Sequence, residues 1–562
     1  MKYIGGNEMK SFKKILSLAL VAIMTLSLFA GCGNKKEFNA DGTAKVQSKT
    51  AIVAYNSVGY GHEWLEVLAN EFNQMYAEEG YKIELKISMA NENNAALEIG
   101  KGGNKNDVDL YLDAYNLESV LDASNKTMRG QGSVLMDLTE TVWNKPAIGK
   151  DKQEESKTIA ERFLLDDTNL YYDGVQEEFK GGLYVVPTGM ELWSTGIVVN
   201  PTVIEKYGYS AENLPRTTDE FNALCAKIAA DSGSTGVYAY SWPGNNASGY
   251  LTYLFFEYFA QYSGAEAFLN FSMTRPTTDA TLDQIISDGW KVYEDKGILE
   301  GFKAMEPIMK PEYSPKGSAA MTHMEAQHQL LTGKAAFMVV GDWLYYQMMG
   351  EYQKEAAQCL MMNTPVLSVI GKECGITDAQ LSEAVKMVDE DKTNEEIIAA
   401  IPGLNEAGAA RIREARNIYC GGEVNLRSGM AIPTYADGSA VATLFARFLL
   451  SDYAQGVIRN KGYKFNCYEC EDYSLENDSP FMQSVLANQD PGDGIYVAMD
   501  SSLSIVRANS GMLYFNHPNL VQPVTFKNVI LDTTGSLTAE KMYEMEKEYA
   551  KQNWSTWAAY IG

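Results

Sequence analysis

The sequence predicts an α/β protein built from at least two lobes. Its 562 residues are too many for one hydrophobic core, so two or more compact units are expected. Short apolar segments that alternate like strands are separated by stretches with helical periodicity, which is typical of a largely parallel sheet with crossover helices. Hydrophobic residues make up 46% and charged residues 21% of the chain, as in ordinary globular proteins.

The chain begins with a pattern typical of a secretory signal. Three lysines precede the apolar run 15–29, which is too short to span a bilayer comfortably. The run closes with the letters LFAGC, which resemble the lipobox of bacterial lipoproteins, with Phe29 where that pattern usually has Leu. We therefore predict a lipoprotein signal peptide over residues 1–31, acylation of Cys32, and a lipid-anchored flexible tether over residues 32–50.

The first lobe is predicted from alternating strand and helix patterns. The expected order is strand 51–58, helix 63–77, strand 81–89, helix 94–100 and strand 107–115. In parallel sheets of this kind, ligands bind beyond the carboxyl ends of the strands. The loops 57–62 and 113–116 are therefore the first candidates for a binding site, and they contain the following residues: Tyr60, His62, Asp113 and Tyr115. Trp64 follows the first loop and can equally face the core.

The middle of the chain continues with strands and helices. Apolar segments at 183–187 and 190–200 predict a strand pair, and Thr218 is the expected N-cap of a helix over 219–231. Further helices are expected at 252–262, 282–296 and 325–331. The last of these leads into an apolar strand, 335–340, after which Gly341 and Asp342 form a turn that presents Trp343.

Residues 361–420 differ from the preceding segments because they contain mainly short helical patterns. Three short helices are expected at 381–388, 395–400 and 406–415, capped by Thr377 with Gln380, by Asn394 and by Asn405. The segment 401–412 faintly resembles a helix-hairpin-helix, but it lacks that motif's second glycine and a basic surface.

The charge disfavours two classes of partner. The formal net charge is −26, so nucleic acids and anionic membrane surfaces are repelled over most of the surface. The chain also carries 34 Tyr, 20 Phe and 8 Trp, and aromatic side chains of this abundance fit a protein with a binding surface.

Known catalytic and metal-binding motifs are not recognisable. His323 and His328 are five residues apart, whereas a zinc-protease helix requires a spacing of four. Cys467 and Cys470 form a Cys-x-x-Cys pair without a second pair to complete a zinc site. We therefore expect no metal, no cofactor and no enzymatic activity, and we leave the pairing of the cysteines open.

Several segments in order resemble the extracellular solute-binding proteins of ABC importers, in the group that includes maltodextrin- and oligosaccharide-binding proteins. They share apolar strands followed by polar turns, and they lie behind the lipobox at Cys32: residues 107–115 (DVDLYLDAY), 183–187 (LYVVP), 197–220, 331–344 (LTGKAAFMVVGDWL) and 429–450.

The resemblance implies a two-lobe, periplasmic-binding-protein-like (Venus-flytrap) fold with an interlobe cleft and a hinge. By analogy the chain would cross between lobes near 187–193, 363–367 and 430–435. The implied N-terminal lobe comprises 51–189 and 366–432, with a helical insertion at about 370–417 whose role stays open. The implied C-terminal lobe comprises 190–365 and 433–562.

The resemblance also implies a function. A lipid-anchored monomer on the extracytoplasmic face of the cell membrane would capture a solute, most simply an oligosaccharide or sugar, and deliver it to an ABC permease. Aromatic rings can stack on sugar faces while polar side chains bind the hydroxyl groups. The candidate contacts in addition to the four loop residues are Glu191, Trp193, Trp242, Asn245, Asn246 and Trp343.

Two other functions remain open at this point. One is a lipid-anchored, glycan-active enzyme such as a glycosidase, which needs only two suitably spaced carboxylates. The other is a glycan-binding surface lipoprotein without a transporter.

Overall fold

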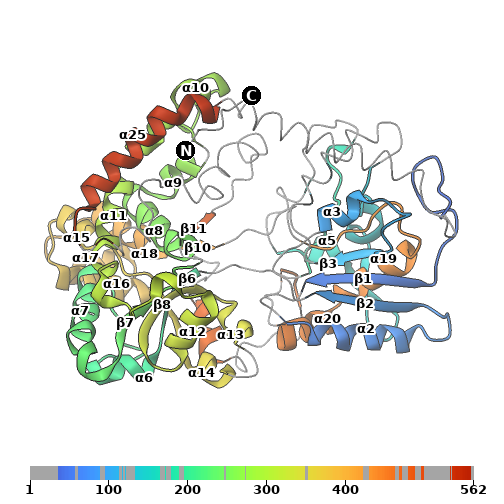
Figure 1. Ribbon diagram of the computed structural model, residues 1–562, viewed down its shortest axis with the longest axis horizontal. Helices are drawn as coiled ribbons and strands as arrows, with labels where there is room; N and C mark the ends of the chain where they lie inside the picture. Colours follow the sequence, from blue (N-terminus) through green and yellow to red (C-terminus); the bar gives the residue numbers. More distant parts are fainter. Residues whose placement is uncertain are drawn as a thin grey trace, which may run out of the picture. The chain divides into compact units, whose positions relative to one another are not determined.

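The computed structural model confirms an α/β architecture of two compact units (Figure 1). The first unit comprises Met1–Glu191 and Val424–Ser474, and the second comprises Leu192–Glu423 and Leu475–Gly562. The structure describes residues 36–56, 61–88, 95–112, 117, 121, 133–164, 171, 179–188, 195–245, 248–272, 274–348, 352–421, 429–462, 467–470, 479–487, 495–498, 532 and 534–558.

A parallel sheet of order β2-β1-β3 forms the centre of the first unit. Its strands are β1 (Thr50–Asn56), β2 (Lys82–Ser88) and β3 (Leu110–Leu112). The crossover helix α2 (Glu63–Met75) buries Trp64, Leu65 and Phe72 on the face that packs against the sheet. This confirms the predicted strand–helix–strand order, because apolar side chains recur at the period that each element requires.

The rest of the first unit surrounds this sheet. On α19, Phe445 packs edge-on against Phe72 of α2, with ring centroids 5.2 Å apart, and so closes the core. The returning chain adds isolated bridges between Tyr111 and Ala431 and between Val186 and Met430. The remaining elements are α3 (Ala95–Gly100), η1 (Thr139–Trp143), β4 (Pro146–Ile148), β5 (Glu154–Thr158), α5 (Ile159–Arg162), α19 (Ser439–Leu449), α20 (Asp452–Val457) and η7 (Ile458–Gly462).

The expectation of a flexible tether up to residue 50 is wrong for its described part. Residues 36–50 form a hairpin that docks on the first unit, where Phe38 is partly buried against the cluster that contains Tyr435. Lys36 makes an ion pair with Asp437 at 2.5 Å. The partly buried Phe38 ring and this ion pair help to hold a segment whose composition is polar.

A mixed sheet of order β11-β10-β6-β8-β7 forms the centre of the second unit, so the prediction of a largely parallel sheet is wrong here. Strand β6 runs antiparallel to β8, β9 and β10, whereas β7 is parallel to β8. The strand bounds are β6 (Thr195–Val199), β7 (Tyr238–Ser241), β8 (Ala335–Gly341), β9 (Leu360–Met362), β10 (Ile418–Gly421) and β11 (Ile495–Ala498).

Helices cover this second sheet, and α8 supplies Phe255, Phe256 and Phe259 to the core. The N-cap of α7 is Thr217 and not Thr218, because the Thr217 hydroxyl accepts a hydrogen bond from the amide of Glu220. The helical bounds are α6 (Pro201–Ile204), η3 (Glu205–Tyr207), α7 (Thr218–Thr235), α8 (Ser248–Ser263), α9 (Ala265–Ser272), α10 (Leu282–Asp288), η4 (Gly289–Glu294), α11 (Lys296–Ile308), η5 (Pro311–Tyr313), η6 (Ser318–Ala320), α12 (His323–Leu331), α13 (Leu344–Gln347), α14 (Gln353–Gln358), α21 (Pro480–Ala487) and α25 (Ala539–Ala558).

The helical block comprises α15 (Ser368–Glu373), α16 (Asp378–Asp389), α17 (Asn394–Ala400) and α18 (Glu406–Asn417). The predicted caps Thr377 with Gln380 and Asn405 are confirmed, whereas Thr393 caps α17 in place of Asn394. The block shares one hydrophobic core with α8, through side chains such as Ile412 and Phe259. It therefore belongs to the second unit and not to the N-terminal lobe.

The division of the chain differs from the predicted lobes in two further respects. Residues 433–474 belong to the first unit, because α19 completes the core of its sheet. The first change of unit, between Glu191 and Leu192, falls within the predicted crossing at 187–193. The other two changes come after Glu423 and after Ser474, so the expected crossings at 363–367 and 430–435 are wrong.

Candidate functional site

Six of the ten predicted ligand contacts lie outside the described residues. They are Tyr60, Asp113, Tyr115, Glu191, Trp193 and Asn246, and the acylation residue Cys32 lies outside them as well. The four described candidates are Trp343, Trp242, Asn245 and His62, and their environments differ.

Trp343 lies where the fully buried strand β8 ends. The strand closes at Gly341, Asp342 is 1% exposed, and Trp343 itself is only partly buried. Its indole lies directly over Gly341, since a Cβ atom on that residue would be 2.2 Å from Cζ3 of the ring. Leu344, which follows, is fully buried and anchors the turn. Trp343 is therefore held in place by its backbone surroundings and retains exposed surface.

Trp242 is part of the second unit's core, which corrects its assignment as a ligand contact. It is 1% exposed, and its Nε1 atom is buried without a hydrogen-bond partner among the described residues. The chain then turns at Gly244, where a Cβ atom would clash at 2.3 Å with Cα of Ala319. The backbone amide of Asn245 donates to Met321, while the residue remains exposed. Of the two candidates Trp242 and Asn245, only Asn245 has accessible surface.

His62 lies at the start of α2 and is partly exposed. Its Nε2 atom is 3.7 Å from Glu66, one turn along the helix. Trp64 is fully buried and packs edge-on against Tyr55 at 5.4 Å, which confirms the alternative that it faces the core. In the first unit His62 is thus the one described candidate with accessible surface.

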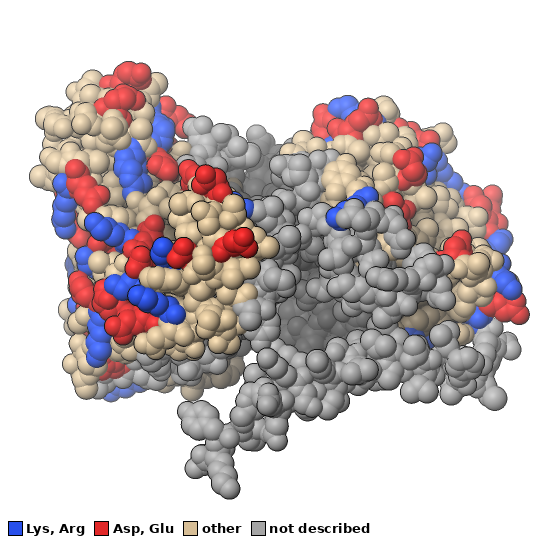
Figure 2. Space-filling model, turned by 90° about the horizontal axis from the view of Figure 1, so that it is seen from above, with Lys and Arg blue, Asp and Glu red and all other residues tan. Residues whose placement is uncertain are grey.

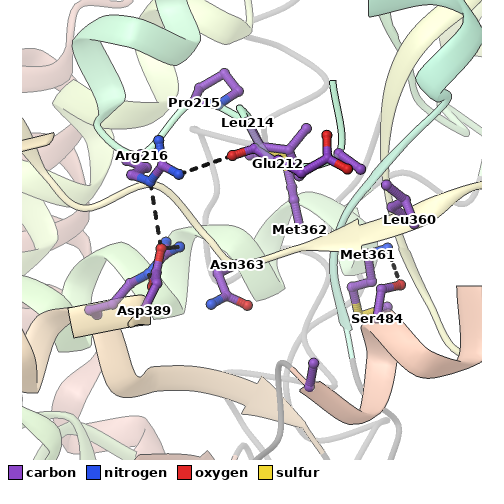
Figure 3. Close-up of a pocket in the computed structure, with 13 residues that line it drawn as sticks. Glu212, Leu214, Pro215, Arg216, Leu360, Met361, Met362, Asn363, Asp389 and Ser484 are labelled. Carbon is purple, nitrogen blue, oxygen red and sulfur yellow. Dashed lines mark hydrogen bonds and ion pairs between the residues drawn. The ribbon is translucent and has the colours of Figure 1, made fainter. Parts of the chain in front are cut away.

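A pocket of about 310 Å³ lies within the second unit (Figure 3). Strand β9 and α21 contribute one side. The loop before α7 contributes Glu212 and Arg216, and the ends of α16 and α18 contribute Asp389 and Arg416. Its lining combines aliphatic or thioether side chains with polar ones: Ala211, Glu212, Leu214, Pro215, Arg216, Leu360, Met361, Met362, Asn363, Asp389, Arg416, Ser484 and Ala487.

The charged end of this pocket is largely neutralised internally. Arg416 binds Asp389 through two hydrogen bonds, of 2.6 and 2.8 Å, and Arg216 approaches the same carboxylate at 3.7 Å. Arg216 also donates to the carbonyl oxygen of Glu212 at 3.2 Å (Figure 3). On the opposite side the Ser484 hydroxyl accepts from the amide of Met361 at 2.8 Å and caps the edge of β9. The charged contacts join α16 to α18 and to the loop before α7, and they leave a mainly apolar hollow.

The arginines of α18 do not form a nucleic-acid surface. Arg411 and Arg413 donate to the backbone carbonyls of Tyr262 and Lys392, and Arg416 pairs with Asp389. On the face shown in Figure 2, acidic and basic side chains are intermingled over the described surface. Neither feature offers the continuous basic band that phosphates require.

The histidines and cysteines do not form a metal site in the part of the chain that the structure describes. No group of three or more His, Cys, Asp or Glu side chains there could hold a metal ion. Burial lowers the pKa of His323, and Nε2 of His328 is 3.0 Å from the hydroxyl of Tyr352. Burial also raises the pKa of the Cys359 thiol to about 12, so this thiol is protonated and unreactive at neutral pH.

The pocket was not predicted from the sequence. Arg216, Asp389 and Arg416 come from three separate elements and carry no local motif that links them.

The two α/β units and the partly exposed residues at their strand ends are typical of a receptor for small molecules rather than of a nucleic-acid-binding protein. The chain belongs to the bacterial extracellular solute-binding protein family, whose sequence profile matches residues 146–456. Among curated protein sequences, none matches the chain.

Solved structures with the same fold include a chitin oligosaccharide binding protein (TM-score 0.54, 14% identity, covering 90% of this chain and 99% of the other). Another is maltose-bound MalE3 from T. maritima (TM-score 0.51, 16% identity, covering 90% and 99%). A third, from Streptomyces coelicolor, is described as a "probable secreted solute-binding lipoprotein" (TM-score 0.50, 14% identity, covering 90% and 98%). At these identities the likeness establishes the fold alone.

Proposed function

We propose that this extracellular solute-binding protein captures an oligosaccharide or sugar and delivers it to an ABC permease. Family membership over residues 146–456 is the observation that carries the proposal. Two of the structures that share the fold are described as binding chitin oligosaccharide and maltose, which supports sugar over other solutes. The family consists of binding proteins, which supports a non-enzymatic role.

The proposed contacts are those that remain accessible or lie outside the described residues. Trp343 supplies a partly exposed ring at the end of β8, and Asn245 and His62 supply polar groups. Tyr60, Asp113, Tyr115, Glu191, Trp193 and Asn246 remain proposed contacts on the sequence pattern alone. A sugar would stack one C–H face on an aromatic ring and give its hydroxyl groups to the polar side chains.

Binding should shift the population of the protein toward the conformation that the permease recognises, because the solute contacts add stability only in that conformation. We propose that the protein acts as a monomer and remains on the outer face of the membrane through acylated Cys32. The Streptomyces coelicolor lipoprotein of similar fold supports the anchor. Among the described residues no helix is long and apolar enough to cross a bilayer.

A thermal-shift screen tests the ligand class. Chitin oligosaccharides, maltodextrins, xylan oligosaccharides, peptides and polyamines are each added to the purified protein. A ligand present at about 100 times its Kd stabilises the folded state by roughly 2.7 kcal/mol, which is readily detected. Stabilisation by one of the sugars is expected; stabilisation by peptides or polyamines alone would overturn the carbohydrate assignment.

Trp343→Ala is expected to weaken the affinity for that sugar about 5- to 30-fold, because a stacked aromatic ring contributes roughly 1 to 2 kcal/mol. Isothermal titration calorimetry measures the change. Trp290→Ala is the matched control, since Trp290 is a partly buried tryptophan of η4 whose ring contacts Lys551. An unchanged Kd for Trp343→Ala, with an unchanged melting temperature, would remove Trp343 from the binding site.

A further inference from the structure

The hairpin at residues 36–50 is closed by its own hydrogen bonds. The amide of Asn39 donates to Thr43 at 2.8 Å, and the amide of Lys45 donates to Glu37 at 2.9 Å. At the turn, the Asp41 carboxylate accepts from the backbone amide and the hydroxyl of Thr43, at 3.0 and 2.7 Å. The segment is therefore a compact unit and not an extended leash.

Three contacts fix this hairpin to the first unit. The Phe38 ring lies so close to Gly103 that a Cβ atom there would be 2.6 Å from Cζ of the ring. Lys36 pairs with the Asp437 carboxylate, and the amide of Ser48 donates to the Asp437 carbonyl oxygen at 2.7 Å. The hairpin is thus held at its beginning, by its aromatic ring and at its return to β1.

The docking site lies at the edge of the sheet where β1 and β3 begin. Asp109, just before β3, accepts from the amide of Ile52 near the start of β1 at 2.8 Å and from the amide of Gly438 at 2.9 Å. Gly438 follows Asp437, which holds the hairpin. Figure 1 shows the hairpin as the dark-blue segment that leads into β1.

Only three residues separate Cys32 from Lys36. Four Cα-to-Cα steps span at most about 14 Å, even in a fully extended chain. The Cα atom of Cys32 can therefore lie at most about 14 Å from the Cα atom of Lys36 in the docked hairpin, and the acyl group adds its own length to this reach.

We propose that the docked hairpin turns the lipid anchor into a short, oriented attachment, with the edge where β1 and β3 begin facing the bilayer. This inference rests on the proposed acylation of Cys32. On the same hairpin Val46 is 77% exposed, the highest fraction among the large hydrophobic residues described, and a lipid surface would cover it. The carboxyl ends of β1 and β3, where solute is expected, then lie about 20 Å further from the membrane.

Fluorescence quenching on vesicles tests the orientation. A fluorescent non-natural amino acid is introduced at Val46 in one variant and at Ser88 in another, since Ser88 is exposed at the opposite end of β2. The acylated full-length protein is reconstituted into phosphatidylcholine vesicles that carry nitroxide-labelled headgroups. Quenching at position 46 is expected to exceed that at position 88 at least about threefold, given the ~20 Å between the two ends of the sheet.

Two controls remove the short attachment without touching the label. One inserts a 20-residue Gly/Ser linker between Lys35 and Lys36, which adds a root-mean-square reach of about 25 Å. The other is the double variant Phe38→Ala with Asp437→Ala, which removes the two side-chain contacts of the docked hairpin. Both variants should make the quenching at position 46 similar to that at position 88.

The outcomes separate this inference from the proposals on which it rests. Flotation with the vesicles but equal quenching at both positions would overturn the orientation alone. Loss of flotation, identical to that of Cys32→Ser, would overturn the acylation and the orientation together. Titration of sugar into the same samples reports solute capture independently of both results.

Discussion

Replacing Arg162 with methionine is expected to destabilise the first unit by about 3 to 5 kcal/mol, the usual cost of removing one partner from a buried ion pair. Arg162 is 4% exposed, and its guanidinium group pairs with Glu155 and Asp452. It also donates to the carbonyl oxygens of Leu450 and Glu469, at 2.6 and 2.8 Å. Without it, two carboxylates and two carbonyl groups each lose a donor at once, and the segment 467–470 loses one of its attachments.

Lys157→Met is the matched control for this prediction. Lys157 lies in β5 and pairs with Glu469, and the two side chains are 52% and 57% exposed. Exposed pairs contribute only about 0 to 1 kcal/mol, so this variant should be nearly neutral. Hydrogen exchange at residues 154–162 and 467–470 measures the local free energy of opening in each variant. Equal protection in Arg162→Met and in the unaltered protein would show that the buried network contributes nothing.

Local pattern was sufficient for elements whose side chains repeat at a fixed period. Strand β1, helix α2 and strand β2 were predicted because their apolar residues alternate or recur at helical spacing. The buried strand β8 and its Gly341–Asp342 turn were predicted for the same reason. Side-chain periodicity reports which face of an element is buried, but it does not report which neighbour covers that face.

Tertiary partners were therefore the part that the sequence did not predict. The helical block was assigned to the wrong lobe because its apolar face, including Ile412, carries no sign that its partner is α8. The hairpin at 36–50 was taken for a leash because one phenylalanine in a polar segment has no periodicity to detect. The Phe38 ring packs against Gly103, which is distant in sequence, so this contact can be recognised only in the folded structure.

The candidate site followed the same rule. Trp343 was correctly placed after a buried strand with exposed surface, since the turn before it is a local signal. Trp242 looked equivalent, because it also follows a strand, but helices of the second unit cover it completely. Whether an aromatic residue at a strand end faces solvent or the core depends on what packs there, and that information is not local.

The second large effect on stability is expected at a buried carboxyl group on α25. Glu546 of α25 is 3% exposed, and its Oε1 atom has no hydrogen-bond partner among the described residues. Burial raises the pKa of this carboxyl group well above its ordinary value, and the pKa of nearby Tyr293 is raised by burial and by Glu546. By contrast, the amide of Ala539 at the start of α25 donates to Glu306 at 2.8 Å, so the helix is held at its beginning.

Glu546→Met is expected to stabilise the second unit at pH 7 by about 1 to 3 kcal/mol, because it removes a buried polar atom that lacks a partner. The raised pKa also makes stability depend on pH. Above the ordinary pKa of 4.5 the unfolded chain releases this proton while the folded chain retains it, so stability falls as pH rises toward the folded-state pKa. The gain from the substitution should therefore shrink as the pH is lowered from 8 to 5, as measured by calorimetry.

Glu548→Gln, an exposed change on the same helix, should show no such dependence. A gain from Glu546→Met that stays constant across this range would mean that Glu546 is not held protonated by its surroundings.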